Sequence, residues 1–239
     1  MKTTEYITVR IERLPKGYVF TCDDFRSEVN SREAIIKALN RMVVMGKIAK
    51  LSKGKYYKPE TTVFGALPPN QNQIVKDLLE SDGKPIGYLT GYSIYNQLGL
   101  STQVSNIIQI GKNEIRPSFV REGFTISFIK QKNTITKENI PLLQVLDAIR
   151  SIKTIPDAPV GESCRRLMAI IRDIQAKPTL VRLALQYPPS TRALLGAMLE
   201  EIGSSPIAEP LKKSLNLITV YKLPGISSVL STAATWNIK

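Results

Sequence analysis

Residues 30–58 constrain the fold more than any other part of the chain. In them, apolar residues that recur at helical spacing are followed by two turn signals. Asn30 is a good helix N-cap, and Glu33 stands three residues later, as in a capping box. The apolar residues that follow recur at helical spacing and predict a buried stripe: Ile35, Leu39, Met42 and Val43. Gly46 follows this stripe, where a left-handed residue commonly ends a helix. We expect a helix that begins near Asn30 and ends at Gly46.

A basic hairpin is predicted directly after this helix. Residues 48–51 favour a short strand, and residues 52–55 (SKGK) favour a tight turn. Tyr56 and Tyr57 start the returning strand, and Pro59 ends its pairing because proline has no N–H to donate.

The preceding residues complete a winged helix-turn-helix. Residues 3–14 predict a helix, residues 18–20 a short strand, and Thr21 the N-cap of a second short helix. Helix, strand, helix, helix and wing in this order are the parts of a winged domain within residues 1–60.

The polar side of the main helix carries hydrogen-bond donors. At about 100° per residue, Lys37, Asn40, Arg41 and Val44 lie opposite the apolar stripe. Such a helix fits the major groove of DNA, where base edges present distinct donors and acceptors. Lys50, Lys53 and Lys55 on the wing would reach phosphates or a minor groove. The helix alone is more typical of an ordinary amphipathic helix with a solvated face, but the helix, its glycine stop and the three-lysine wing together favour DNA binding.

The charge of the whole chain supports a polyanionic partner. Net charge is +13 and the pI is near 9.7, which favours nucleic acid over an anionic membrane surface. Residues 1–60 carry 13 Lys and Arg against 7 Asp and Glu, residues 61–150 carry 9 against 7, and residues 151–239 carry 11 against 6. The basic excess is therefore greatest towards the two ends.

Enzyme chemistry is poorly supported. The chain has no His, no glycine-rich phosphate loop and no obvious pair of catalytic carboxylates. Cys22 and Cys164 are far apart and form no CxxC pair, which argues against zinc and suits a reducing cytoplasm.

The spacing of Tyr88, Tyr92 and Tyr95 favours core and turn positions over base stacking. We expect no enzymatic activity, metal or cofactor, and no secretory signal or membrane span.

Proline- and glycine-rich breaks predict two further parts, an α+β module over 61–150 and a mainly helical part over 151–239. Residues 64–69 (FGALPP) read as a connector, followed by a helix over 71–80. Three β-rich runs predict an antiparallel meander over 103–110, 114–120 and 124–131. A helix from Lys137 keeps Pro141 in its first turn. Later helices are predicted at 161–175, 178–187, 190–201 and 205–214, with one further strand at 217–223. The fold class expected is α+β.

Several blocks resemble the AbiEi-like antitoxin family of bacterial type IV toxin–antitoxin and phage-defence operons. They are GKIAKLSKGKYYKP, FGALPP, GKPIGYLTGYSIYNQLGLSTQV, FIKQKN and ENIPLLQVLDAIRSIKTIPD, and the resemblance covers residues 3–200. It implies a cytoplasmic autorepressor that binds repeats in its own promoter and counters a nucleotidyltransferase-like toxin encoded nearby. By motif match, the DNA contacts fall on Arg32, Lys37, Asn40, Arg41, Lys53 and Lys55. The alternative is a non-enzymatic interaction module whose winged domain docks a protein partner instead of DNA.

Overall fold

The computed structural model describes residues 3–63, 65–216 and 218–239. The protein is of the α+β class, which confirms the expectation from sequence. The chain groups into two compact units, Met1–Asp77 with Val120–Gly123, and Leu78–Phe119 with Phe124–Lys239. Each unit has its own apolar core. Residues on both sides of position 150 share the core of the second unit.

The first unit begins with a winged-helix arrangement. Its three short strands pair antiparallel in the order β1-β3-β2, with Phe20 opposite Tyr56 and Ala49 opposite Tyr57. The elements are α1 (Thr3–Glu12), β1 (Val19–Thr21), the 3₁₀ helix η1 (Cys22–Phe25), α2 (Arg32–Val44), β2 (Ala49–Ser52) and β3 (Lys55–Tyr57). The helices and the wing predicted over residues 3–58 are therefore present.

Aromatic and aliphatic side chains fill the space between these helices and the sheet. Phe20 meets Phe25 edge-on at 5.7 Å between ring centroids and stacks on Tyr56 at 6.3 Å. Ile7 of α1 and Ile35 of α2 are fully buried against this aromatic group. Burying each such side chain stabilises the fold by roughly 1.5–3 kcal/mol, so the core holds α2 with a fixed face outward.

The start of α2 differs from the prediction by one residue. Ser31, not Asn30, is the N-cap: it is extended, and its hydroxyl accepts a hydrogen bond from the Ala34 N–H at 3.3 Å. The predicted Asn30–Glu33 capping box is wrong because its cap position lies one residue too early. A capping box does form at η1, between Thr21 and Asp24.

The end of α2 confirms the glycine stop. Gly46 has a positive φ of 69°, and its N–H donates to the Val43 carbonyl at 2.9 Å. The Lys47 N–H donates to the Met42 carbonyl at 3.0 Å, so two terminal carbonyls of the helix are satisfied. A residue with a Cβ would be strained at this φ.

The connector after the wing is more ordered than predicted. β4 (Glu60–Thr62) and β5 (Gly65–Leu67) pair as an antiparallel hairpin, which corrects the reading of 64–69 as a plain connector, although Phe64 itself lies outside the described residues. The helix predicted over 71–80 is divided into α3 (Gln71–Ile74) and α4 (Lys76–Leu79). The break falls at Val75, whose φ of −112° and ψ of 15° leave the helical region.

The sheet of the second unit overturns the predicted meander. Its four strands have the order β10-β11-β9-β8, and β11 runs parallel to β9, with Ile126 opposite Ile108. The chain leaves β9 and returns through a β10–β11 hairpin, so β11 points the same way as β9. The strands are β8 (Tyr88–Thr90), β9 (Ile107–Lys112), β10 (Phe119–Arg121) and β11 (Phe124–Lys130). A separate small hairpin pairs β6 (Glu80–Ser81) with β7 (Lys84–Pro85).

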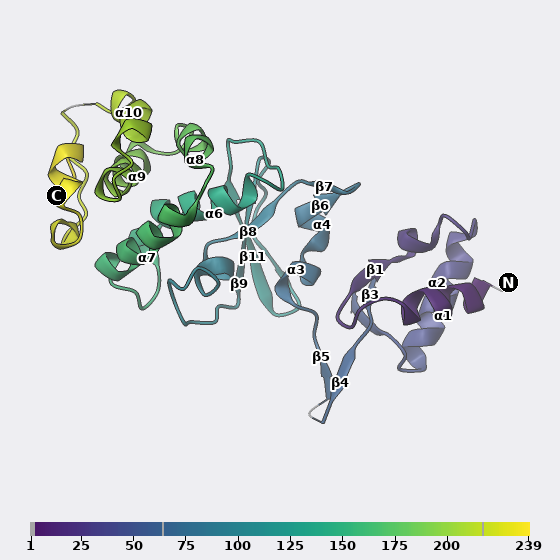
Figure 1. The fold of residues 1–239 in the computed structure, drawn as a ribbon. Coiled ribbons are helices and arrows are strands. Elements are labelled where there is room, and N and C mark those ends of the chain that lie inside the picture. The colour runs from purple at the N-terminus through teal and green to yellow at the C-terminus, as the bar shows by residue number, and fades with distance from the viewer. Residues whose placement is uncertain (1–2, 64, 217) are drawn as a thin grey trace. The chain divides into compact units, whose positions relative to one another are not determined.

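Helices dominate the rest of the second unit, and the predicted helices after residue 137 are confirmed. Figure 1 shows α6 beside the sheet and the later helices following in green and yellow. They are α5 (Tyr92–Tyr95), α6 (Ile140–Arg150), α7 (Val160–Asp173), α8 (Lys177–Ala184), α9 (Pro189–Glu201) and α10 (Ser205–Lys213), with the 3₁₀ helices η2 (Ile152–Thr154), η3 (Ile226–Ser228) and η4 (Ser231–Trp236). Pro141 lies in the first turn of α6, as predicted.

The C-terminal strand predicted at 217–223 is not formed over its described part. Leu217 lies outside the described residues, and residues 218–223 contribute one isolated bridge, between Tyr221 and Ile238. Leu223 is buried in the helical core and Tyr221 packs against it, whereas Ile218 and Val220 are exposed. Trp236 closes this core and packs so tightly on α9 that a Cβ at Gly196 would lie 2.2 Å from its ring. Across the described ranges, no helix is both long and apolar enough to span a bilayer.

Candidate nucleic-acid interface

The outward face of α2 presents donors on a rigid support. Lys37, Asn40 and Arg41 are exposed, whereas Ile35 and Leu39 on the opposite side are fully buried. Val44 is 88% exposed on the same outward face. The core therefore fixes which side chains the helix offers to a partner, and the structure brings these predicted site residues together.

Tyr56 of the wing orients the Asn40 amide. The Tyr56 hydroxyl donates to Asn40 Oδ1 at 2.9 Å. This contact occupies the acceptor end of the amide and leaves both Nδ2 hydrogens for another group. Burial raises the pKa of Tyr56, so its hydroxyl is a proton donor at neutral pH. Sequence reasoning found Asn40 but missed this partner, because the contact joins a helix to a strand 16 residues away.

The three lysines of the wing differ in exposure and in ion pairing. Lys50 and Lys53 are exposed, and neither forms an ion pair within the described residues. Lys55 is only 18% exposed and pairs with Asp77 at 2.6 Å. Lys50 in β2 and Lys53 in the turn therefore offer uncompensated charge on the wing, whereas the charge of Lys55 is already countered.

Asp77 is the centre of a small ionic network. Asp77 Oδ2 pairs with Lys55, and Oδ1 accepts a hydrogen bond from Arg121 Nη1 at 2.7 Å. The same Arg121 nitrogen donates to the Ile74 carbonyl at 2.9 Å. Burial acts to raise the pKa of Asp77, but the hydrogen bonds from Arg121 and Lys55 outweigh it and hold that pKa below its usual value. Asp77 is therefore ionised at neutral pH and holds Lys55 away from a partner.

Arg32 stands apart from the other helix residues. It is the first residue of α2 and is exposed, but it lies towards η1 rather than on the outward face. Interaction with the buried Cys22 thiol raises the pKa of Arg32, which stays cationic in any case. Arg32 is thus available at the edge of the interface.

Two features of the interface were missed by sequence reasoning. Lys47 is exposed directly after the glycine stop, next to the C-terminal end of α2. Glu33 is also exposed, and its position in the helical period places it on the outward face instead of in a capping box. Glu33 adds one negative charge to an otherwise basic face.

The tyrosines near Gly91 are structural. Tyr88 and Tyr95 are buried, and Tyr92 meets Tyr95 edge-on at 5.8 Å. Thr90 donates from its hydroxyl to the buried Asp147 at 2.8 Å. The hydroxyl groups of Tyr88 and Thr90 are therefore engaged inside the second unit, whereas Tyr92 is half-buried and lines a pocket together with Tyr95. No group of three or more potential metal ligands occurs in the described part of the chain, and both cysteines are buried and unbridged.

The fold and this interface define an α+β protein with a winged helix at its N-terminal end. The chain belongs to a family of unknown function, DUF6088, whose model matches residues 6–179. It is also similar in fold to the crystal structure of the RV2827C protein from Mycobacterium tuberculosis, with a TM-score of 0.58 and 13% sequence identity over 98% of this chain and 89% of that chain. A search of curated proteins gave no match.

Proposed function

We propose that this protein is a double-stranded DNA-binding autorepressor and the antitoxin of a type IV, AbiE-like toxin–antitoxin system in the bacterial cytoplasm. The observation that carries the DNA-binding part is the outward face of α2, where Lys37, Asn40 and Arg41 project from a fully packed core beside a basic wing. The proposal assigns no catalytic residue, cofactor or metal to the chain.

Recognition would combine base reading with phosphate neutralisation. With α2 in the major groove, Lys37 and Arg41 donate to guanine O6 and N7. Asn40, whose oxygen is engaged by Tyr56, donates from Nδ2 to a purine N7 or another acceptor. Val44 offers an apolar contact to a thymine methyl group. Lys50 and Lys53 bind phosphates, which adds affinity with little sequence information.

The antitoxin part of the proposal rests on the resemblance of the sequence blocks between residues 3 and 200. It implies a nucleotidyltransferase-like toxin in the neighbouring reading frame. Co-expression of that frame with and without this protein tests it directly. Growth arrest by the neighbour alone and growth with both supports an antitoxin, whereas a neighbour that is harmless or is not countered contradicts that role.

Fluorescence anisotropy tests DNA recognition. The purified protein is titrated against its own upstream DNA and a scrambled duplex of equal length at about 150 mM salt. We expect tighter binding to the native duplex by about 10³-fold or more. Lys37→Ala with Arg41→Ala should reduce this preference, because it removes base contacts.

A matched control is Arg10→Ala with Arg13→Ala, which removes the same charge from exposed positions at the end of α1 and just after it. This variant should keep the preference for the native duplex. Equal, weak binding of both duplexes by the unaltered protein would contradict the assignment as a sequence-specific regulator.

A second candidate, a protein-docking role for the winged unit, is favoured by one observation. Val44 and the next residue, Met45, are 88% and 61% exposed at the end of α2. Adjacent exposed apolar side chains suit a protein partner as well as a thymine methyl group. A partner that co-purifies in high salt, together with negligible DNA binding, would support this role.

A further inference from the structure

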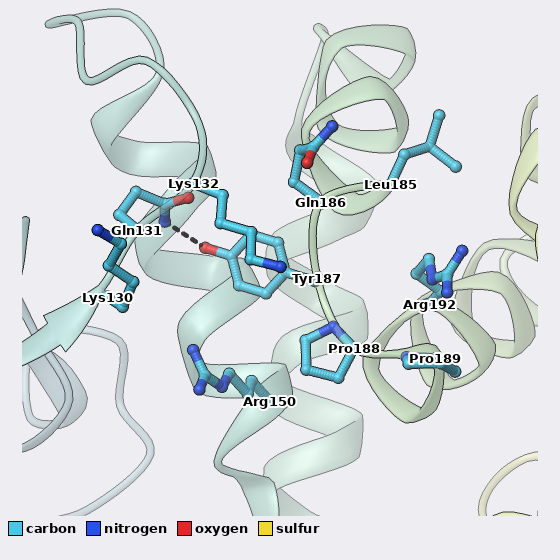
Figure 2. Close-up of a pocket in the computed structure, with 10 residues that line it drawn as sticks. All are labelled: Lys130, Gln131, Lys132, Arg150, Leu185, Gln186, Tyr187, Pro188, Pro189 and Arg192. Atoms are coloured by element: carbon cyan, nitrogen blue, oxygen red, sulfur yellow. Dashed lines mark hydrogen bonds between the residues drawn. The ribbon is translucent and has the colours of Figure 1, made fainter. Parts of the chain in front are cut away.

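A basic pocket opens within the second unit, and none of the residues that line it is among those assigned to DNA. Its volume is about 430 Å³, within the range of sites for small ligands (Figure 2). Four cationic side chains from three segments line it: Lys130 and Lys132 at the end of β11, Arg150 at the end of α6, and Arg192 in α9. No Asp or Glu is among the residues that line it in the described chain.

The four cations are not neutralised by ion pairs within the described residues. Lys130 donates to the Asn113 carbonyl, and Arg192 Nη1 donates to the Ser214 carbonyl at 3.0 Å. Arg192 Nε is enclosed and has no partner in the described chain. Lys132 and Arg150 are exposed at the pocket. Carbonyl contacts position two of the side chains without neutralising them. Arg150 also interacts electrostatically with the buried Asp147, whereas no acidic partner is found in the described chain for the other three.

The floor of the pocket is rigid because its polar groups are already satisfied. Gln131 Nε2 donates to the hydroxyl of Tyr187 at 2.9 Å and to that of Tyr88 at 2.8 Å. The Tyr187 hydroxyl donates to Asp147 Oδ1 at 2.8 Å, and Asn133 donates to Gln131 Oε1. Gln131 and Tyr187 are both buried. These groups hold the floor in place, so binding falls to the four cations around it (Figure 2).

From this arrangement we propose that the pocket binds the phosphoryl group of a nucleotide. Two guanidinium groups and two ammonium groups suit an anion with at least two charges and several acceptor oxygens. Leu185, 38% exposed, and Pro188 and Pro189 add an apolar side to the same pocket, against which a nucleoside can pack. The phosphate comes from one of two sources, a small nucleotide or the 5′ end of a nucleic-acid strand.

The alternative is a basic surface that is merely solvated, as expected on a chain of net charge +13. Generic charge would respond to the number of cations removed and not to their position. A pocket would respond to the loss of its own cations alone. Variants of equal charge therefore separate the two readings.

The test uses the full chain and calorimetric titration with inorganic pyrophosphate, with ATP, and with a short single strand carrying either a 5′-phosphate or a 5′-hydroxyl. The pocket variant is Lys132→Ala with Arg150→Ala, at two exposed positions. The control is Lys137→Ala with Arg182→Ala, also exposed but absent from the lining. Far-ultraviolet circular dichroism checks that each variant is folded.

We expect saturable binding that falls by about tenfold or more in the pocket variant and by less than about twofold in the control, as the loss of two charge-assisted contacts implies. Binding of pyrophosphate or ATP identifies a small nucleotide as the source. Binding confined to the 5′-phosphorylated strand identifies a strand end. Three results would overturn the proposal: no saturable binding to any probe, equal loss of binding in both variants, or a strand indifferent to its 5′-phosphate when neither pyrophosphate nor ATP binds.

Discussion

At the scale of single residues, the Tyr56 hydroxyl decides which way the Asn40 amide points, because it donates to Asn40 Oδ1 at 2.9 Å. Tyr56→Phe removes this donor and lets the amide rotate. We expect the affinity for the native promoter duplex to fall by up to about tenfold, while binding to a scrambled duplex stays the same. Phosphate contacts are unaffected by this change.

A double-mutant cycle with Asn40→Ala checks the mechanism. In the Asn40→Ala background, Tyr56→Phe should cause no further loss of preference for the native duplex, because its partner is gone. A further loss of the same size in that background would show that Tyr56 acts by some route other than Asn40.

Asp147 is the most deeply buried carboxyl group of the second unit and is 2% exposed. Burial raises the pKa of Asp147, against hydrogen bonds from Tyr88, Thr90 and Tyr187 that lower it. A carboxyl group whose pKa is raised in the folded state contributes stability at a pH below its pKa in the unfolded state. This contribution is lost as the pH rises through its pKa in the folded state. The free energy of unfolding of the unaltered protein, measured relative to that of Asp147→Asn, should therefore increase as the pH is lowered from neutral.

Urea unfolding of the protein and of Asp147→Asn at several pH values measures this difference. The Asn variant keeps the shape of the side chain but does not titrate. A difference in unfolding free energy that grows with rising pH would mean that the hydrogen bonds outweigh burial, and that the pKa is lowered in the folded state.

At the scale of elements, the wing is restrained by Asp77, which pairs with Lys55 at 2.6 Å. Because the pKa of Asp77 is lowered, its carboxylate is charged throughout a DNA-binding assay at neutral pH. Asp77→Asn removes this negative charge. We expect Lys55 to gain a phosphate contact. Affinity for native and scrambled duplexes should rise together, and the salt slope should steepen by about one.

Glu28→Gln is the matched control for this change. Glu28 is exposed, belongs to the first unit and has no ion pair within the described residues. The control alters net charge equally but leaves Lys55 restrained. An equal gain in affinity in both variants would assign the effect to overall charge instead of to the wing.

Helical elements were predictable from sequence because each one carries its own period. The stripe that contains Ile35 and Leu39 located α2, and proline and glycine punctuation located α6 to α10. Strand direction was not predictable: alternation in β9 and β11 is the same whether they pair parallel or antiparallel. Lys55 was predicted to contact phosphate, yet its ion pair with Asp77 depends on residues far apart in sequence. The basic pocket likewise combines segments that no local pattern connects.

At the scale of the whole molecule, the net charge of +13 is divided between two separate units. The proposals assign them different anions: duplex phosphates to the wing, and a nucleotide phosphoryl group to the pocket. If about six duplex phosphates are neutralised, the logarithm of the binding constant should fall against the logarithm of salt with a slope near −5. Lys50→Ala with Lys53→Ala should flatten this slope by about two, because two phosphate contacts are lost.

The pocket variant Lys132→Ala with Arg150→Ala is the internal control, since it removes the same charge from the second unit. Its slope for the native duplex should equal that of the unaltered protein. Anisotropy titrations between about 50 and 300 mM salt give all three slopes under one set of conditions. If the pocket variant flattens the slope as much as the wing variant does, the duplex is contacted by both units, and the division of the basic charge between two ligands is wrong. If only the wing variant flattens it, the excess charge of the second unit is left for a ligand other than the operator.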